Sequence, residues 1–558
     1  MSPRTRRWLV VLILAFVLLV AFVLRTFNVD WAEGQLPHPD ERSTVAFYAP
    51  SIRWPAEPGT FFDPRRSTLN PLWDLGSNSR RSYTYGHFPL YLLVISGHLA
   101  QKLVPVAEAI GVPQAYVDMM RIAVGSPGYA WVGRLLMAIA DTITLLYLFL
   151  IGWRVYNKHV GLLAAALGAF TVLQIQLAHF FAVDPISTTF TVAAIYHAIR
   201  MVESRGWRQT VLAGIMAGLA IACKFSALPI LAAPGVAGLI IWWSENRGRR
   251  AEDGESAQGE AKGQSSWTGI GLAAAAIGVA VVAFVVTSPF VILDWENFYL
   301  AVIKEQGAMV RGIADFPFTR QYRGTTPYLY FIAQQVRWGM GWFLGLVGWV
   351  AFGWAIVKTL MLRARPGELI ILSWLVPYFL ITGSFLAKFN RYMVPVVPLL
   401  AVLGAGMLWA LAGWVAGRKW QVAKLVPSLP SGPALSETKD RKSQVAELVP
   451  SLASGQALGA MEDGEAQTAD ATPHHGTRNT EHASSGSSAS SSSSPPCCGR
   501  WLSSMASTIA STLSSRPRNG CTRMCPTAVC GSPSIGRRGC RWCCPSRAGI
   551  RASTAGAM

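Results

Sequence analysis

Two neighbouring carboxylates, Asp40 and Glu41, stand in the motif His38-Pro39-Asp40-Glu41 near the start of the chain. Paired acids suit proton transfer because one stays ionised while its charge raises the pKa of the other. Such a pair can deprotonate an acceptor hydroxyl or hold a divalent cation. The motif also fits a helix N-terminus, where proline suits the first turn and acids suit the helix dipole. Both interpretations stay open at this point.

A third acid, Asp184, is the only Asp, Glu, Lys or Arg between Lys158 and Arg200. A carboxylate in a long apolar region is costly to bury, so it indicates a charged partner or a function. It either lines one site with Asp40 and Glu41 or caps the helix that starts near Pro185.

Basic and tyrosine side chains gather in two later segments: Arg320, Tyr322 and Arg323 in the first, and Lys388, Arg391 and Tyr392 in the second. Arginine binds phosphate through its planar fork, so both segments suit a phosphate group. The alternative is interfacial cations that meet lipid phosphates nonspecifically or extend their charged ends toward water.

The composition places these residues in a membrane protein. Of 558 residues, 51% are hydrophobic and only 14% are charged, with a net charge of +19. Soluble chains carry about a quarter charged residues, so the composition excludes a soluble single domain.

About ten apolar segments are long enough to cross a hydrocarbon core, which takes roughly 20 helical residues. They are 8–27, 129–153, 160–178, 186–201, two short spans within 210–243 that turn at Lys224, 269–286, 343–360, 369–386 and 393–415. We therefore predict an all-α polytopic membrane protein.

Short cytoplasmic loops collect Lys and Arg, and with ten spans every basic cluster falls on that side. The basic residues before the first span place the N-terminus in the cytoplasm, and the length of this span favours an anchor over a cleaved signal peptide. The apolar stretch 87–104 is interpreted as a helix in the outer interface. Asp40, Asp184, Lys224, Arg323 and Arg391 then all face the same extracytoplasmic side.

The expected organisation has four parts. The first transmembrane helix covers residues 1–27, and an external loop with juxtamembrane helices covers 28–128. A core of about nine helices covers 129–416 and includes an external loop at 291–342. The tail covers 417–558.

Seven short motifs occur in order along the chain: Leu36-Pro37-His38-Pro39-Asp40-Glu41, Tyr85-Gly86-His87-Phe88-Pro89, Val132-Gly133-Arg134-Leu135-Leu136, Ala178-His179-Phe180-Phe181-Ala182-Val183-Asp184, Cys223-Lys224-Phe225-Ser226, Tyr322-Arg323-Gly324-Thr325-Thr326-Pro327 and Lys388-Phe389-Asn390-Arg391-Tyr392. Together they resemble the GT-C class of membrane glycosyltransferases. The resemblance is to the family 39-like, polyprenyl-phosphate-dependent enzymes, which include protein O-mannosyltransferases and aminoarabinose transferases.

The resemblance implies an inverting transfer of a sugar from a polyprenyl-phosphate donor to a lipid, glycan or protein acceptor. Asp40 would be the base, Asp184 a second acid, and Glu41 a further catalytic or metal-binding acid. The donor phosphate would be held by Lys224, Arg320, Arg323, Lys388 and Arg391. The acceptor pocket would include His38, His87, Tyr322 and Tyr392. No particular cofactor is implied, and a divalent metal ion at Asp40 and Glu41 stays open.

We expect a multi-pass protein of the cell membrane that contacts lipids and no nucleic acid. The main alternative function is a transporter or flippase of a lipid-linked or anionic substrate, which would also place charges near membrane cavities. Transporters usually show related halves, and none is visible in this sequence. A scaffold subunit would need none of the charges on the outer side.

The tail from residue 417 has the composition of a disordered linker, with a Ser-rich run at 484–494. Eight cysteines crowd its end: Cys497, Cys498, Cys521, Cys525, Cys530, Cys540, Cys543 and Cys544. A zinc site, a disordered tail and a shifted reading frame after about residue 500 are the three interpretations, and the codons of the gene distinguish the last.

Overall fold

The computed structural model describes residues 2–255 and 267–425, and nearly all of this part of the chain is helical. Within it, the strands are a two-residue antiparallel pair, β1 (Trp73–Asp74) and β2 (Ser79–Arg80), with Trp73 opposite Arg80. Helices suit an apolar chain because they satisfy their backbone groups internally. The all-α prediction is confirmed. The predictions for the tail beyond residue 425 lie outside the described residues.

Seven helical segments of the described chain are long and apolar enough to cross a membrane, or eight if one bent pair counts as a single span. They comprise α1 (Pro3–Thr26), α6 (Ser126–Val155), the segment Phe225–Arg247, which joins the short helix 225–231 to the first part of α11 (Ala232–Glu255), α12 (Thr268–Thr287), α17 (Trp342–Leu360), α18 (Pro366–Gly383) and α19 (Val397–Leu425). The bent pair is α7 (Lys158–Ala169) with α8 (Val172–Ala178), which meet at 60°. The predicted count of ten is not confirmed.

Two predicted spans account for the difference in number. The segments predicted at 186–201 and at the start of 210–243 are helices, α9 (Val183–Ser204) and α10 (Trp207–Cys223), but they do not reach the length and apolarity of the others. Buried hydroxyls, including Thr188, Thr189 and Thr191, make α9 more polar. The predicted turn at Lys224 is present, since α10 ends at Cys223 and Lys224 is extended.

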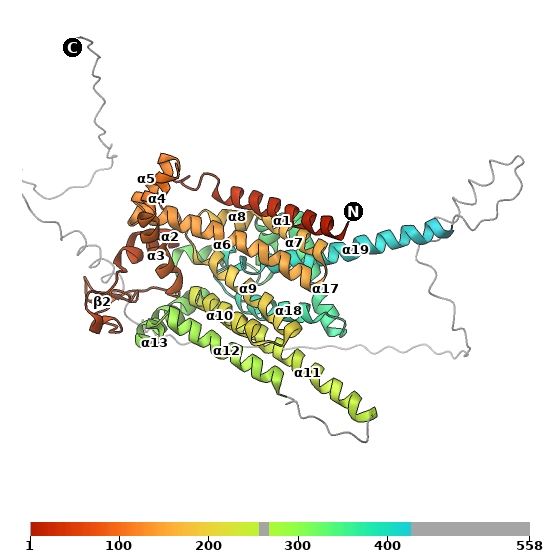
Figure 1. Ribbon diagram of the computed structural model, residues 1–558. Coiled ribbons are helices and arrows are strands. Elements are labelled where there is room, and N and C mark those ends of the chain that lie inside the picture. Colours follow the sequence, from red (N-terminus) through yellow and green to blue (C-terminus); the bar gives the residue numbers. More distant parts are fainter. Residues whose placement is uncertain (1, 256–266, 426–558) are drawn as a thin grey trace, which may run out of the picture. The chain divides into compact units, whose positions relative to one another are not determined.

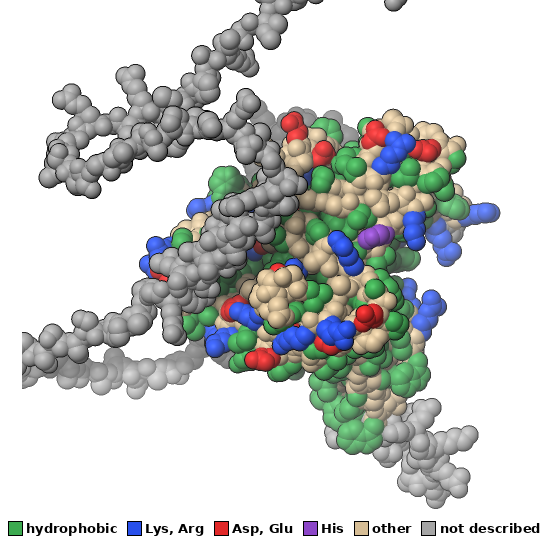
Figure 2. All heavy atoms as spheres, turned by 90° about the vertical axis from the view of Figure 1, so that its left-hand side faces the viewer, with side chains coloured by type: hydrophobic (Ala, Val, Ile, Leu, Met, Phe, Trp, Pro, Cys, Tyr) green, Lys and Arg blue, Asp and Glu red, His purple; other side chains and the backbone are tan. Residues whose placement is uncertain are grey.

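The long helices lie side by side, and the elements of the two predicted external loops gather at one end of them (Figure 1). The first loop contains α2 (Pro39–Ser43), α3 (Phe88–Lys102), α4 (Val104–Ala109), α5 (Gln114–Arg121), the short helices 44–48, 49–51 and 58–60, and the two strands. The second contains α13 (Phe290–Leu293), α14 (Trp295–Phe298), α15 (Gln306–Arg311), α16 (Leu329–Gln334) and the short helices 299–305, 317–322 and 335–339. Figure 2 shows this end of the molecule, where basic and acidic side chains lie among hydrophobic ones.

Buried and half-buried polar contacts join the two loops. The Asp294 carboxylate, which is almost fully buried, accepts hydrogen bonds from Arg65 at 3.1 Å and from Asn70 at 2.8 Å. Glu305 pairs with Arg80 and accepts from Ser82 at 2.5 Å. Because these contacts connect segments that are far apart in sequence, the two loops form one layer over the end of the bundle.

Glycine lets two of the helices approach closely. A Cβ at Gly214 of α10 would stand 2.4 Å from the Ala276 carbonyl oxygen of α12, and one at Gly218 would stand 2.3 Å from that of Ala280. Small residues four positions apart permit such contact, which replaces the hydrophobic effect as a driving force between helices in lipid. The packing fixes α10, and therefore Lys224 at its end.

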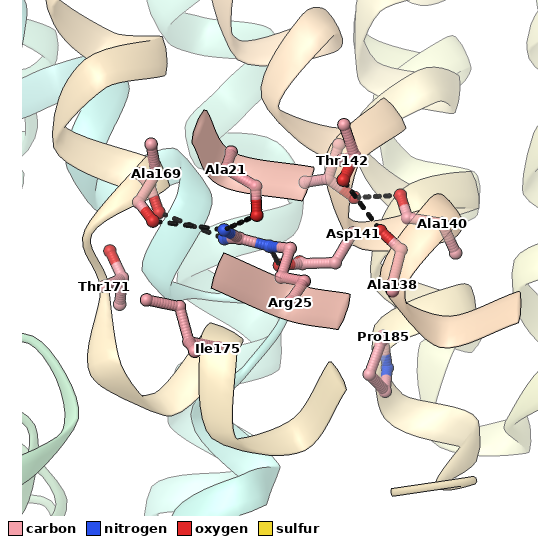
Figure 3. Close-up of polar contacts among 12 residues, drawn as sticks. Ala21, Arg25, Ala138, Ala140, Asp141, Thr142, Ala169, Thr171, Ile175 and Pro185 are labelled. Carbon is pink, nitrogen blue, oxygen red and sulfur yellow. Dashed lines mark hydrogen bonds and ion pairs between the residues drawn. The ribbon is translucent and has the colours of Figure 1, made fainter. Parts of the chain in front are cut away.

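A buried ion pair holds α1 against α6 and the bent pair (Figure 3). Arg25 Nε donates to Asp141 Oδ2 at 2.5 Å, and neither side chain is exposed. The same guanidinium donates to the Ala169 carbonyl at 3.1 Å and that of Gly168 at 3.4 Å. Since α7 ends at Ala169, Arg25 satisfies the Ala169 carbonyl, which lies at the bend, and adds a second contact to the Gly168 carbonyl, which also accepts the Thr171 N–H.

Replacing Asp141 by alanine is expected to destabilise the protein by about 3 kcal/mol or more, because the Arg25 charge stays buried without its partner. The measurement is the midpoint of thermal denaturation in detergent. The double variant Arg25→Leu/Asp141→Leu should recover most of the loss. A single variant as stable as the unmodified protein would contradict this assignment.

Candidate active site

Asp40 lies in the first turn of α2, directly after His38 and Pro39. The interpretation of this motif as a helix N-terminus is therefore confirmed. The Asp40 carboxylate also forms an ion pair with Arg391, and the two side chains are 18% and 19% exposed. Arg391 belongs to a short helix, Asn390–Met393, that connects α18 to α19. The structure thus brings together an acid and a cation from opposite ends of the described chain.

Asp184 lies in the first turn of α9 and is almost fully buried. It does not cap the helix, whose N-cap is Ala182, so the capping interpretation is wrong. Instead it accepts a hydrogen bond from Lys224 Nζ at 2.7 Å. The break between α10 and the next helix places Lys224 at this position.

Tyr392 joins the two ion pairs into one site. The Lys224 ammonium lies 4.8 Å from the centroid of the Tyr392 ring, within the range of a cation–π interaction. Tyr392 directly follows Arg391 and is 5% exposed. Contacts therefore run from Asp184 through Lys224, Tyr392 and Arg391 to Asp40.

The surroundings of these pairs favour a neutral histidine beside a buried cation. Burial and the positive charge of Arg391 lower the pKa of His38 to about 4, partly opposed by Asp184. His38 is therefore uncharged at neutral pH and packs on Phe180, with ring centroids 5.0 Å apart. Burial also lowers the pKa of Arg391.

Polar atoms without hydrogen-bond partners in the described structure gather near Arg391. They are His38 Nδ1, Asn390 Oδ1, Arg391 Nε and the Tyr392 hydroxyl oxygen, all buried. Buried polar atoms of proteins are nearly always hydrogen-bonded, so such a group needs an explanation. These atoms have hydrogen-bonding capacity left for a polar ligand.

The structure places Glu41 away from this chemistry. Its two oxygens accept from Arg134 of α6 at 2.8 and 3.0 Å, and Oε1 also accepts the Phe181 backbone N–H at 2.9 Å. Both charged side chains are at most 1% exposed. Glu41 therefore fixes α2 onto α6 and the turn before α9, which positions Asp40 next to it.

The variant Glu41→Gln tests this positioning role. We expect a loss of about 3 kcal/mol in stability, because the Arg134 charge stays buried without a carboxylate. The midpoint of thermal denaturation in detergent measures it, and Glu33→Gln, in the same loop, is the control. A Glu41→Gln protein of unchanged stability would mean that this pair does not hold α2.

The basic residues predicted in the second external loop lie on the surface. Arg320 and Arg323 both pair with Asp315 at 2.8 Å, and their side chains are 55% and 61% exposed. Tyr322 between them is buried and packs on Phe389, with ring centroids 5.5 Å apart. The structure therefore connects this loop to the site through Phe389 and does not bring the two arginines to Asp40.

Lys388 and His87 are both buried. In the described structure, Lys388 Nζ has one hydrogen bond, a long one of 3.4 Å to the Leu386 carbonyl, so its charge stays largely uncompensated. His87 lies among Tyr83, Tyr91 and Phe290, and burial lowers its pKa to about 3. No contact joins His87 directly to Asp40 or Arg391 among the described residues.

Sequence reasoning missed Arg134 and Gly86 as positioning residues. Arg134 could have been found as a charge inside an apolar segment. A Cβ at Gly86 would stand 1.8 Å from the Ala222 carbonyl oxygen, and the Gly86 N–H donates to the Cys223 carbonyl at 3.2 Å. This contact holds the first external loop against the end of α10, beside Lys224.

A divalent metal at Asp40 and Glu41 stays a prediction. Arg134 and the Phe181 backbone occupy the Glu41 carboxylate, which leaves Asp40 alone as a ligand. Within residues 2–255 and 267–425, no three His, Cys, Asp or Glu side chains gather as a metal site. The residues present therefore fit a metal poorly.

The solved structures that resemble this one have low sequence identity to it. The structure of ArnT from Cupriavidus metallidurans bound to undecaprenyl phosphate aligns over 76% of this chain and 66% of its own, with 17% identity and a TM-score of 0.44. The archaeal oligosaccharyltransferase AglB from Archaeoglobus fulgidus, in complex with an inhibitory peptide and a dolichol-phosphate, aligns over 80% and 55%, with 14% identity and a TM-score of 0.44. The chain thus spans about two thirds and about half of their lengths. Comparison with curated proteins found no match.

A family match covers the middle of the chain. The matched segment contains Arg134, Asp184 and Lys224 but not Asp40 or Arg391. Residues 120–250 match the family described as dolichyl-phosphate-mannose-protein mannosyltransferase, and the resemblance to family 39-like GT-C membrane glycosyltransferases is thereby confirmed.

Proposed function

We propose that this protein is a glycosyltransferase that moves a sugar from a polyprenyl-phosphate donor to an acceptor hydroxyl, with inversion at the anomeric carbon. The observation that carries the proposal is the ion pair of Asp40 and Arg391 beside that of Asp184 and Lys224. It supplies a base and cations for a phosphate in one place. The family match of residues 120–250 supports sugar transfer from a lipid phosphate.

Arg391, Lys224 and Lys388 are the groups proposed to hold the donor phosphate. Negative charge grows on the phosphate as the bond to the sugar breaks, and fixed cations in a partly dry site stabilise that charge. Arg391 is 19% exposed, and Lys388 is buried with only a carbonyl contact. Both side chains have N–H groups left that can donate hydrogen bonds to phosphate oxygens.

Asp40 is the group proposed to activate the acceptor. Its carboxylate takes the hydroxyl proton while the acceptor oxygen forms a bond to the anomeric carbon. The bond from that carbon to the phosphate oxygen breaks, and its electron pair stays on the phosphate. Inversion requires attack opposite the phosphate, so the base and the cations must face each other across the sugar. Asp40 and Arg391 lie on two different segments and are in direct contact in this structure, so the bound sugar phosphate has to separate them.

The contact between Asp40 and Arg391 implies an exchange of partners. A donor phosphate that binds Arg391 competes with the Asp40 carboxylate for the same guanidinium. Binding of the donor then frees Asp40 for the acceptor hydroxyl. Donor binding is thereby coupled to activation of the base.

Further features follow from the sequence and belong to the same proposal. The site faces the extracytoplasmic side of the cell membrane, with the N-terminus in the cytoplasm. The acceptor is a lipid, a glycan or a protein. Arg320, Arg323 and Tyr322 contribute to the donor side through the contact of their loop with Phe389.

An assay on the purified protein tests this function. Detergent-solubilised protein is given a polyprenyl-phosphate sugar labelled in the sugar, together with candidate acceptors of each class. We expect labelled product whose anomeric configuration, read by NMR, is opposite to that of the donor. Movement of the labelled lipid across vesicle membranes without any transfer would instead identify a flippase.

A further inference from the structure

A large cavity lies at the same end of the molecule but is not lined by Asp40 or Arg391. Its volume is about 1100 Å³, and its walls come from the segment 52–69, from α3 and from the residues at and after the end of α12. This end of the molecule faces the viewer in Figure 2, with hydrophobic and basic side chains intermixed. The cavity exceeds the size of most small-molecule sites, which run to about 1000 Å³.

Large apolar side chains line this cavity and remain uncovered. Phe62 of the first loop is 62% exposed, Ile95 of α3 is 64% exposed, and Val286 of α12 is 72% exposed. Exposed apolar surface that lines a hollow marks a place for an apolar ligand or the membrane. Val286 lies in the last turn of a helix apolar enough to cross the membrane. The cavity therefore opens where a span ends, within reach of lipid chains.

The charged residues that line the cavity are basic. They are Arg53 and Lys102; His98 also lines the cavity, and no Asp or Glu is among the lining residues. In the described structure the Arg53 and Lys102 side chains have no hydrogen bond and no ion pair. Neighbouring arginines differ, since Arg65 pairs with Asp294 and Arg81 with Asp74. Two unpaired cations beside an apolar cavity complement an anionic head group with a hydrocarbon chain.

We propose that this cavity binds an anionic membrane phospholipid, with a hydrocarbon chain against Ile95 and Val286 and the phosphate between Arg53 and Lys102. The site is separate from the donor-phosphate site at Arg391 and does not depend on the proposed transfer reaction. Burial of the chain supplies most of the affinity, and the two cations select the charge of the head group.

Photo-crosslinking locates the lipid. Purified full-length protein in a nonionic detergent is mixed with phosphatidylglycerol that carries a diazirine in its acyl chain, irradiated and digested. We expect the label within residues 52–69, 88–102 and 285–289, the three segments that line the cavity. Unlabelled phosphatidylglycerol should compete at a concentration about tenfold or more below that of phosphatidylcholine with the same chains. Equal competition by the two lipids, or a label elsewhere, would overturn the proposal.

Variants separate the roles of charge and of apolar volume. Arg53→Ala/Lys102→Ala should weaken labelling about tenfold or more, whereas the matched control Lys304→Ala/Arg337→Ala, outside the cavity, should not. Ile95→Trp should fill the cavity and remove labelling while the thermal midpoint stays unchanged, because the side chain is already exposed. Polyprenyl phosphate that competes as well as phosphatidylglycerol, with donor affinity lost in the double variant, would make this the donor's own groove and refute the proposal.

Discussion

Asp40→Asn is expected to reduce the turnover number about a thousandfold, within the range that a general base contributes. The amide keeps the size of the carboxylate but cannot take the proton of the acceptor hydroxyl. Donor affinity should not fall, and it should rise if Arg391 is released from its ion pair with Asp40. Initial rates with a polyprenyl-phosphate sugar, together with donor binding measured separately, give both quantities.

The control for this variant is Asp30→Asn, an exposed acid in the same loop, which should keep normal turnover. The thermal midpoint of Asp40→Asn should lie close to that of the unmodified protein, because its side chain is partly exposed. Turnover that survives the substitution would rule out Asp40 as the base.

Arg391→Ala is expected to weaken donor binding about a hundredfold, because loss of one partner of a charged hydrogen bond that substrate binding buries costs about 2–5 kcal/mol. The donor affinity of Arg391→Lys should lie between those of Arg391→Ala and the unmodified protein, since lysine keeps the charge but loses the planar fork that matches phosphate. The measurement is the donor dissociation constant in detergent.

The control for Arg391 is Arg311→Ala, an exposed arginine in the second external loop whose Nε donates to the Gly307 carbonyl. It should bind the donor normally. Equal donor affinity for Arg391→Ala and the unmodified protein would remove Arg391 from the phosphate site and leave Lys224 and Lys388 as the candidates.

The sequence predicted most of the helices because a bilayer imposes strong rules on composition. Apolar segments mark spans regardless of how they pack, and the break at Lys224 follows from a run too long for one crossing. The number of spans could not be settled in the same way. The segment around α9 is a helix, but its buried hydroxyls place it near the limit of apolarity that composition can resolve.

The sequence also predicted that Asp40 and Arg391 lie on the same side of the membrane, because the basic clusters of the loops assign each loop to a side. The distribution of basic clusters does not predict which charged side chains pair with each other. Glu41 stands next to Asp40 in sequence, yet it faces Arg134, whereas Asp40 faces Arg391. Arg320 and Arg323 share Asp315 on the surface, a pairing that depends on the fold of a loop without strong periodicity.

The buried pair of Arg25 and Asp141 shows a further limit of sequence reasoning. Each charge was visible at the edge or in the middle of an apolar segment. The guanidinium of the pair also binds the Ala169 carbonyl at the bend between α7 and α8. Hydropathy does not reveal such a bend.

The most direct measurement is a structure of the protein with a bound polyprenyl phosphate, determined by cryo-electron microscopy in a nanodisc. We expect phosphate oxygens within hydrogen-bond distance of the Arg391 guanidinium and near Lys224 or Lys388, with Asp40 separated from Arg391 and facing the space next to the phosphate. A phosphate bound elsewhere, with the ion pair of Asp40 and Arg391 intact, would contradict the central claim.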